Sequence, residues 1–291
     1  HEYDVPYMIV HNKCDVQRLH PMTAETIHSI TGKEILDFSI YEAENLDELI
    51  GRMKNTIPTT AYQKPSLFGD LIHPKDVVLL ITPVDSEAPD GRMILPQNMA
   101  IRDVLDNDCI CVTVKETEIT DFLKLGIKPA LAVTDSQAFG LVSKLIPEDV
   151  PLTSFSIIFA RLKGNFPKYM EGTATISALK DGDKVLILES CTHQVSCDDI
   201  GRFKIPNWMK KFTEKELEFK IVSGLSEIDE DIENYALIVQ CGGCMVTRKQ
   251  LHSRLKPAID SGVPVTNYGL AIAYMHGIFD RATAMFPKAN Q

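Results

Sequence analysis

The sequence has no apolar run that could span a membrane, and no charged segment followed by an apolar one of the kind that forms a signal peptide. A helical span would need about 20 mainly apolar residues. Basic residues are also in short supply, because 30 Lys and Arg stand against 40 Asp and Glu, a net charge of −10 at pH 7. Nucleic-acid binding needs basic surface to neutralise phosphates. We therefore expect neither a membrane nor a nucleic acid as partner.

Cysteine is scarce as well. The seven cysteines are odd in number and lack the spacing of a disulfide framework, which favours a reducing, cytoplasmic compartment. The length of 291 residues and the hydrophobic content of 44% are typical of an ordinary globular protein with two or three domains and a sizeable core.

Two short motifs, CTH at residues 191–193 and CGGC at residues 241–244, contain candidate metal ligands. Residues 183–190 predict a buried strand that runs into the first motif, and residues 235–240 predict one that runs into the second. Ligands of open α/β sheets gather beyond the carboxyl ends of the strands, so two neighbouring parallel strands would bring these groups together. The sequence predicts a metal or iron–sulfur centre with the ligands Cys191, Cys241, Cys244 and His193.

Zinc and iron–sulfur chemistry are both open on these residues alone. Zinc accepts three Cys and one His at a closed structural site, whereas three thiolates on an iron–sulfur cluster leave one iron to a weaker ligand. Gly242 and Gly243 favour the bulkier cluster because glycine allows close backbone approach. Residues 245–260 are typical of a helix, whose N-terminus would favour thiolates and an anionic cluster. Structural zinc and a simple pair of reduced cysteines are the alternatives.

Strand-like and helix-like segments alternate along the chain, which predicts an α/β protein with mainly parallel sheets. We distinguish three blocks, each expected to be an α/β unit, at residues 1–64, 65–164 and 165–291.

The first block contains Asn-Lys-x-Asp directly after an apolar strand predicted at residues 5–10. This pattern resembles the guanine-specificity motif of small GTPase domains, in which the Asp pairs with guanine while the Asn and Lys brace the loop. A second strand at residues 34–40 corresponds to the other guanine-contacting loop of that family. An accidental polar turn after a strand is the alternative. The residues that the resemblance implies are Asn12, Lys13, Asp15 and Ser39.

No GxxxxGK[ST] loop, whose backbone N–H groups cradle phosphates, occurs anywhere in the chain. A guanine pocket without a phosphate cradle and a magnesium site cannot hydrolyse GTP. The first block is therefore expected to be the C-terminal remnant of a GTPase domain, in a chain that is a fragment of a longer GTPase. We predict that this chain is inactive as an enzyme, and that GTP and Mg²⁺ bind only to a complete domain.

The second block has no GxGxxG, no nucleophile elbow and no recognisable pair of catalytic carboxylates. Cys109 and Cys111 share one face of a strand and are expected in the core, where free Cys is common. Because catalytic motifs are missing, we expect this block to serve in packing or self-association. An edge strand could pair with the same strand of a second copy across a two-fold axis. Strands are predicted at residues 76–83, 109–115, 130–134 and 152–160, and helices at 97–106, 118–125 and 136–145.

The third block carries the most specific motifs, because CTH is followed by DDIGRxKIP at residues 198–206 and by CGGC. Together with the guanine motif and the middle block, they resemble the FeFe-hydrogenase maturation GTPases, the HydF family, over essentially the whole chain except most of the GTPase domain. That family has a GTPase domain, a dimerisation domain and a domain that binds a 4Fe–4S cluster. The resemblance implies a GTPase remnant, a dimerisation domain and a cluster-binding domain for the three blocks in turn.

The family's activity implies a scaffold and carrier, which receives a diiron precursor as cargo and hands it to the FeFe-hydrogenase apoprotein. Expected partners are that apoprotein, the radical-SAM maturases and a second copy of the chain in a homodimer. By motif, Cys191, Cys241 and Cys244 would be the cluster thiolates. An iron–sulfur electron-transfer protein and a binding module with structural zinc are the other function classes.

The ligand of the fourth iron stays open. The family often has a histidine directly before CxxC, where this chain has Gln240, a poor iron ligand. His193 and Glu189 are candidates, and His193 would serve equally as a hydrogen-bond partner of a ligand. A weak O or N donor could leave when the diiron complex arrives. Water and three further residues are the other candidates, namely Cys197, Asp198 and Asp199.

Two further expectations concern the surroundings of the motifs. A third strand at residues 263–266 should end at the same crevice, and Arg202 is expected as the ion partner of Asp198 and Asp199. A basic run could dock an acidic partner or an anionic precursor, or could simply be solvated surface. This run consists of Arg202, Lys204, Lys210 and Lys211, beside an exposed Trp208.

Overall fold

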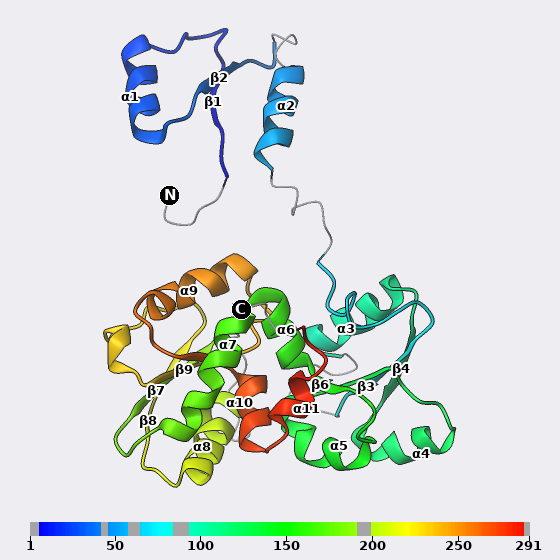
Figure 1. Ribbon diagram of the computed structural model, residues 1–291. Helices are drawn as coiled ribbons and strands as arrows, with labels where there is room; N and C mark the ends of the chain where they lie inside the picture. Colours follow the sequence, from blue (N-terminus) through cyan, green and yellow to red (C-terminus); the bar gives the residue numbers. More distant parts are fainter. Residues whose placement is uncertain (1–5, 42–45, 58–64, 84–92, 191–198, 288–291) are drawn as a thin grey trace. The chain divides into compact units, whose positions relative to one another are not determined.

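The computed structural model describes residues 6–41, 46–57, 65–83, 93–190 and 199–287. The chain divides into two compact units, His1–Pro65 and Ser66–Gln291. Among the described residues, all strand pairs are parallel, in one two-stranded and two four-stranded sheets, so the predicted α/β class with parallel sheets is confirmed (Figure 1). None of the helices in the described part of the chain has the length and apolar character that crossing a membrane requires.

The first unit is a small parallel pair of strands with two helices. Strand β1 (Ile9–Asn12) pairs in register with β2 (Ile35–Phe38), and the helices are α1 (Pro21–Thr31) and α2 (Leu46–Thr56). Helix α1 begins with Pro21, which needs no N–H partner there, and ends at Gly32 with a φ of 65°. Both strands expected in this block are therefore present, the first at Ile9–Asn12 in place of the predicted residues 5–10.

The second unit contains both four-stranded sheets. The first sheet has the order β4-β3-β5-β6, with β3 Val77–Ile81, β4 Ile110–Val114, β5 Leu131–Thr134 and β6 Leu152–Ser154. The second has the order β10-β9-β7-β8, with β7 Lys184–Glu189, β8 Glu218–Ser223, β9 Leu237–Gln240 and β10 Val265–Asn267.

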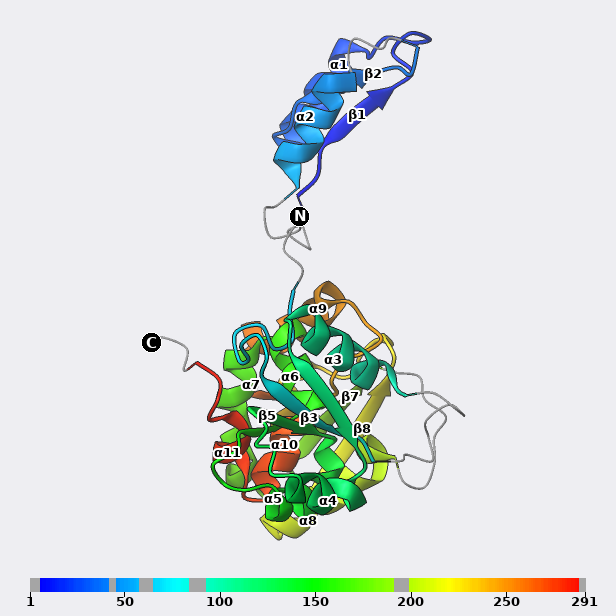
Figure 2. The same ribbon diagram turned by 90° about the vertical axis from the view of Figure 1, so that its right-hand side faces the viewer.

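Helices cover the sheets and join them, and one hydrophobic cluster extends through both sheets. Helix α6 contacts α3 and β6 of the first half of this unit and α9, α10 and β10 of the second, and it lies between the two sheets (Figures 1 and 2). The helices are α3 Leu95–Asp106, α4 Ile119–Lys124, α5 Phe139–Leu145, α6 Phe155–Lys163, α7 Phe166–Thr173, α8 Ile205–Thr213, α9 Arg248–Asp260, α10 Tyr268–Met275 and α11 Phe279–Thr283.

The strand predicted at residues 152–160 is wrong beyond Ser154. The chain turns there into helix α6, because the Ser154 hydroxyl accepts a hydrogen bond from the Ile157 N–H at 3.3 Å and so caps the helix. Residues 155–160 are nearly all apolar and buried, so they show neither the period of a strand nor that of a helix. Only the cap residue distinguishes the two structures.

Candidate metal centre

The ends of three parallel strands meet at the CGGC loop. Strand β9 pairs with β7 on one side and with β10 on the other, so that Gln240 lies opposite both Leu188 and Asn267. The Cys241 N–H continues the ladder and donates to the Leu188 carbonyl at 2.9 Å. The expectation that two strand ends, and a third beside them, share one edge is therefore confirmed.

Part of the predicted ligand set lies outside the described residues. This applies to Cys191 and His193, and to the further candidates Cys197 and Asp198. Strand β7 ends at Glu189, two residues before Cys191, so the chain enters that motif from the strand next to β9. Within the ranges that the structure describes, no three His, Cys, Asp or Glu side chains form a group able to hold a metal ion.

The sulfur of Cys241 is surrounded by N–H donors. Its Sγ accepts a hydrogen bond from the Ser190 N–H at 2.9 Å and lies 3.6 Å from Nε2 of Gln240. Gln240 is fully buried, and its Nε2 also donates to the Ser190 hydroxyl at 2.7 Å. Hydrogen bonds to the charged form of a group favour that form, so these donors suit a thiolate that ligates a metal.

The side-chain oxygen of Gln240 is in an unusual position. Its Oε1 atom is buried and has no hydrogen-bond partner among the described residues. A buried unpaired acceptor is costly, and such atoms are uncommon in folded proteins. Gln240 thus supports Cys241 through its donor end, which is a role different from ligating iron.

The two glycines of the loop are not equivalent. Gly243 has a φ of +63°, and a Cβ there would lie 3.1 Å from Leu251 Cδ1 and 3.2 Å from Val246 Cγ2. Gly242 has no positive φ, and a Cβ there would meet Ser156 Oγ at an ordinary 3.6 Å. The close approach that the sequence predicted for the glycine pair is therefore required only at Gly243.

Helix α9 begins later than the predicted residue 245. Its first residue is Arg248, because Thr247 caps it and exchanges hydrogen bonds with Gln250 in a capping box. The helix N-terminus therefore follows Cys244 by several residues, and its first N–H groups are partly satisfied by this cap.

Cationic side chains surround the loop. The Lys163 Nζ donates to the carbonyls of Gly243, Cys244 and Val246, each at 3.0 Å. Arg254 donates to the carbonyls of Val222 and Gly224. Burial lowers the pKa of the Arg254 guanidinium, whereas negative charge at Cys241 acts in the opposite direction. Positive charge beside several thiolates and sulfides is electrostatically favourable.

Glu189, one of the candidate iron ligands, has other partners. Its carboxylate accepts from Arg202 Nε and Nη2 at 3.0 to 3.2 Å and from the Ser223 hydroxyl at 2.7 Å. The Glu189 carboxylate raises the pKa of Arg202. A Cβ at Gly201 would lie 2.2 Å from the Tyr268 hydroxyl and 3.0 Å from Glu189 Oε1, so the glycine leaves space for both side chains. Both carboxylate oxygens are therefore engaged in a nearly buried ion pair.

Of the two ion partners expected for Arg202, Asp198 lies outside the described residues, and the pair with Asp199 is wrong. The guanidinium of Arg202 reaches Glu189, and Asp199 instead accepts the backbone N–H of Arg202 at 2.9 Å. This contact caps the π-helical turn Ile200–Lys204, where a short Asp side chain competes well for backbone donors.

Two lysines of the predicted basic run have partners of their own. Lys204 donates to Gln137 at 3.2 Å, and Lys210 pairs with Glu216 at 3.3 Å. The expected exposure of Trp208 is wrong, since its ring is half-buried and packs edge-on against His276 with centroids 5.4 Å apart. Trp208 belongs to α8, and the packing of this helix on α10 buries part of its ring.

Sequence reasoning missed Lys163 and Arg254. Lys163 lies just beyond the segment predicted as a strand, so no pattern connected it with a loop that is 80 residues distant. The cap at Ser154 is the signal that could have revealed helix α6 and thereby the position of its last residue.

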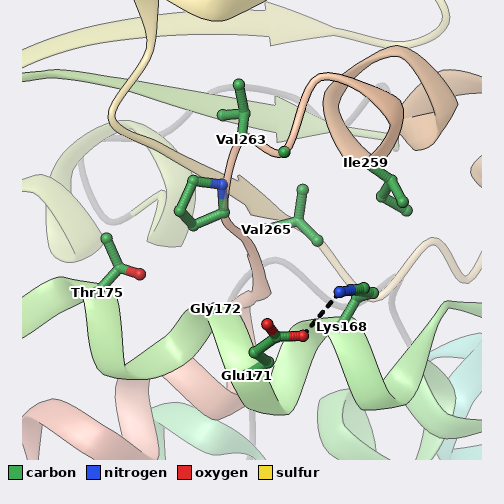
Figure 3. Close-up of a pocket in the computed structure, with 9 residues that line it drawn as sticks. Lys168, Glu171, Gly172, Thr175, Ile259, Val263 and Val265 are labelled. Carbon is green, nitrogen blue, oxygen red and sulfur yellow. Dashed lines mark hydrogen bonds and ion pairs between the residues drawn. The ribbon is translucent and has the colours of Figure 1, made fainter.

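A cavity of about 130 Å³ lies at the opposite end of β10 from this site (Figure 3). Lys168 and Glu171 form an ion pair at its rim, with Nζ and Oε2 2.8 Å apart. The cavity adds no metal ligand to the candidate centre. Its lining includes Lys168, Glu171, Gly172, Ile259, Val263 and Val265.

The guanine-motif residues also share one edge. The Cys14 N–H donates to the Phe38 carbonyl at 3.2 Å, which joins the loops that follow β1 and β2. Lys13 has a φ of 62°, and its N–H donates to Asn12 Oδ1 at 2.9 Å. Asn12, Lys13 and Asp15 are exposed, whereas Ser39 is buried. The two predicted loops therefore meet at the carboxyl end of this sheet.

Comparison with known families gives two adjacent matches. Residues 67–164 match the model described as hydrogen maturase F dimerization domain, and residues 167–285 match the hydrogen maturase F tetramerization domain. A comparison with curated proteins gives no match.

A solved structure offers a weaker likeness. The chain is similar to an ABC transporter solute-binding protein from Burkholderia multivorans at 18% identity, over 67% of this chain and 79% of that one, with a TM-score of 0.24. A likeness of this size supports no functional argument.

Proposed function

The chain belongs to the hydrogen maturase F family, and on this basis we propose that it is a scaffold and carrier for assembly of the FeFe-hydrogenase active site. In this role it binds a 4Fe–4S cluster and delivers a diiron precursor, as cargo, to the hydrogenase apoprotein. Radical-SAM maturases would supply that precursor. The family match supports a role in hydrogenase maturation, and the residues of the CGGC loop support the finer proposal.

The observation that carries the proposal is the CGGC loop at the carboxyl end of β9, with N–H donors directed at Cys241. Cys241 and Cys244 would hold the cluster together with Cys191, which follows the neighbouring strand β7. The donor set fits the cluster, because Gly243 occupies a conformation that a side chain would crowd and Lys163 supplies positive charge.

When bound, the cluster would supply one iron with a weak ligand that a ligand of the diiron precursor could replace. Among the proposed ligands of that iron, His193 is favoured over Glu189, since the Glu189 carboxylate is occupied by Arg202 and Ser223. Breaking that ion pair to reach iron would leave the half-buried Arg202 uncompensated, which is costly. Asp199 is likewise engaged in capping the turn before α8.

The first test is anaerobic iron and sulfide analysis with electron paramagnetic resonance of the reduced protein, with and without cyanide or imidazole. We expect a 4Fe–4S signal that shifts on addition of the ligand, and loss of iron in C191S, C241S and C244S. The matched control is Cys111→Ser, a thiol on β4 that should not affect the iron content. An unshifted signal would favour an electron carrier, and zinc in place of iron would refute the cluster.

Self-association is a further part of the proposal. The matched dimerization and tetramerization domains support an oligomeric chain. We propose strand β4 as a pairing edge, because it is the outer strand of its sheet and Ile110 and Thr113 on it are exposed. An unpaired edge is a ready template for a second strand.

The first unit is proposed as the guanine-contacting part of a GTPase domain. Asn12, Lys13, Asp15 and Ser39 would contribute to that pocket, and the meeting of the two loops at one edge supports this role. We expect no GTP turnover by this chain, because it has no phosphate-cradling loop. GTP hydrolysis by the purified chain, measured as phosphate release, would contradict this expectation.

A further inference from the structure

Lys163 makes an unusual set of contacts at the CGGC loop. Its ammonium group donates to three carbonyls of that loop, those of Gly243, Cys244 and Val246, each at 3.0 Å. It also lies over the ring of Phe159 at 5.5 Å from the centroid. An ammonium has three N–H donors, which equals the number of loop carbonyls that Lys163 contacts. One side chain thus binds three peptide carbonyls within a stretch of four residues.

These contacts orient the loop. In a trans peptide the C=O and N–H groups point in opposite directions, so the N–H groups that follow the carbonyls of Gly243 and Cys244 point away from Lys163. The Val246 N–H closes the turn by donating to the Gly243 carbonyl at 3.2 Å, which Lys163 also binds. The ammonium therefore stabilises both the turn and the direction of its peptide dipoles.

The lysine comes from the other half of the unit. It is the last residue of α6, which follows directly from β6 of the first four-stranded sheet. The beginning of the same helix also faces this site, since the Ser156 hydroxyl bonds to Asn267 and would meet a Cβ at Gly242. Helix α6 lies within the stretch that matches the dimerization domain, whereas the CGGC loop lies in the stretch that matches the tetramerization domain.

We propose that Lys163 is a positioning residue of the cluster site, which holds the CGGC loop in place and raises the reduction potential of the bound cluster. The role of Lys163 in holding the loop is inferred from the contacts alone. Its effect on the reduction potential rests on the proposed function. A fixed positive charge beside an anionic cluster favours its reduced form, because reduction adds negative charge.

The role of Lys163 in holding the loop is tested on the metal-free protein by hydrogen–deuterium exchange. In Lys163→Met, three carbonyls lose a charged donor, and we expect exchange of peptides covering residues 241–247 to be about tenfold faster or more. Peptides covering β7 and β9 should exchange as in the wild type. The matched control is Lys168→Met, which removes an exposed lysine paired with Glu171. Unchanged exchange in the loop would overturn the proposal that Lys163 holds it in place.

The effect of the Lys163 charge on the reduction potential is tested by redox titration of the cluster-loaded protein, monitored by electron paramagnetic resonance. Lys163→Met and Lys163→Gln both remove the charge and should lower the midpoint potential, whereas Lys163→Arg should retain it. The glutamine keeps an amide donor for the loop, so it provides a folded neutral variant if the methionine variant fails to fold. A midpoint potential in Lys163→Gln equal to that of the wild type would overturn the proposal that Lys163 raises the reduction potential.

The two proposals fail in different ways. A wild-type chain that binds no iron would refute the proposed function, while faster loop exchange in Lys163→Met would still support Lys163 as the anchor of the loop. An iron-loaded wild type whose loop exchange and potential are unaffected by either neutral variant would refute the role of Lys163 and leave the cluster intact.

Discussion

Replacing one glycine of the CGGC loop, but not the other, should destabilise the protein. Gly243 has a φ of +63°, in the left-handed region that L residues rarely adopt, whereas Gly242 does not. Gly243→Ala and Gly242→Ala thus make the same chemical change at adjacent positions, and they differ only in backbone conformation and in the space around the added methyl group.

The expected size follows from three contributions. The left-handed conformation costs a non-glycine residue about 1–2 kcal/mol. The new methyl group of Gly243→Ala would also lie 3.1 Å from Leu251 and 3.2 Å from Val246, and crowding of this kind costs about 1 kcal/mol or more. Alanine restricts the unfolded chain and returns about 0.4–1 kcal/mol. We expect Gly243→Ala to lower the free energy of unfolding by about 1–3 kcal/mol.

Gly242→Ala should behave differently. Its methyl group would make only an ordinary contact with Ser156 at 3.6 Å, so we expect a change within about 0.5 kcal/mol, or a slight gain. Urea unfolding followed by the fluorescence of Trp208, the single tryptophan, measures both variants. A thermal scan should show a loss of about 2–4 °C per kcal/mol for a unit of this size. Equal stability of the two variants would refute the argument.

Three further predictions concern packing, pH and assembly. Gly172→Ala would place a methyl group 2.2 Å from the Val265 carbonyl oxygen and should lower the free energy of unfolding by about 1–3 kcal/mol in urea; wild-type stability would contradict this. The hydrogen bond from Arg161 lowers the pKa of Asp70, so their contribution to stability is present above the ordinary value of 3.8 and is lost as pH falls through the lower folded-state pKa. Asp70→Asn should therefore flatten the acid limb of a thermal-stability profile, and an unchanged limb would refute it. Thr113→Pro removes an edge N–H of β4 and should weaken self-association in analytical ultracentrifugation, whereas Thr113→Val should not; equal association of both would exclude that edge.

Much of the fold is predictable from local patterns. Buried strands such as Val77–Ile81 and Lys184–Glu189 are short apolar runs next to turn residues, and the alternation with helices predicts parallel pairing. The meeting of the CGGC loop with the end of β7 follows from that pairing alone, since parallel neighbours end at the same edge.

Helix α6 was not predictable in the same way. Residues 155–160 are apolar in nearly every position, so their period indicates neither structure. Strand β8 was missed because it is a half-buried edge strand with polar residues among its apolar ones. In both cases the neighbouring elements decided the outcome.

The sequence by itself determined which residue types could bind a metal and at which strand ends they lie. Ligand identity and strand position depend on side-chain chemistry and on short apolar runs, and both can be read from the local sequence. Only the tertiary structure decided that Lys163 binds the CGGC loop, that Glu189 pairs with Arg202, and that, of the two glycines in that loop, Gly243 is the one that needs to be glycine. The contact of Lys163 with Cys244 and that of Glu189 with Arg202 join residues 81 and 13 positions apart, and their geometry depends on how the elements pack, which no local pattern encodes.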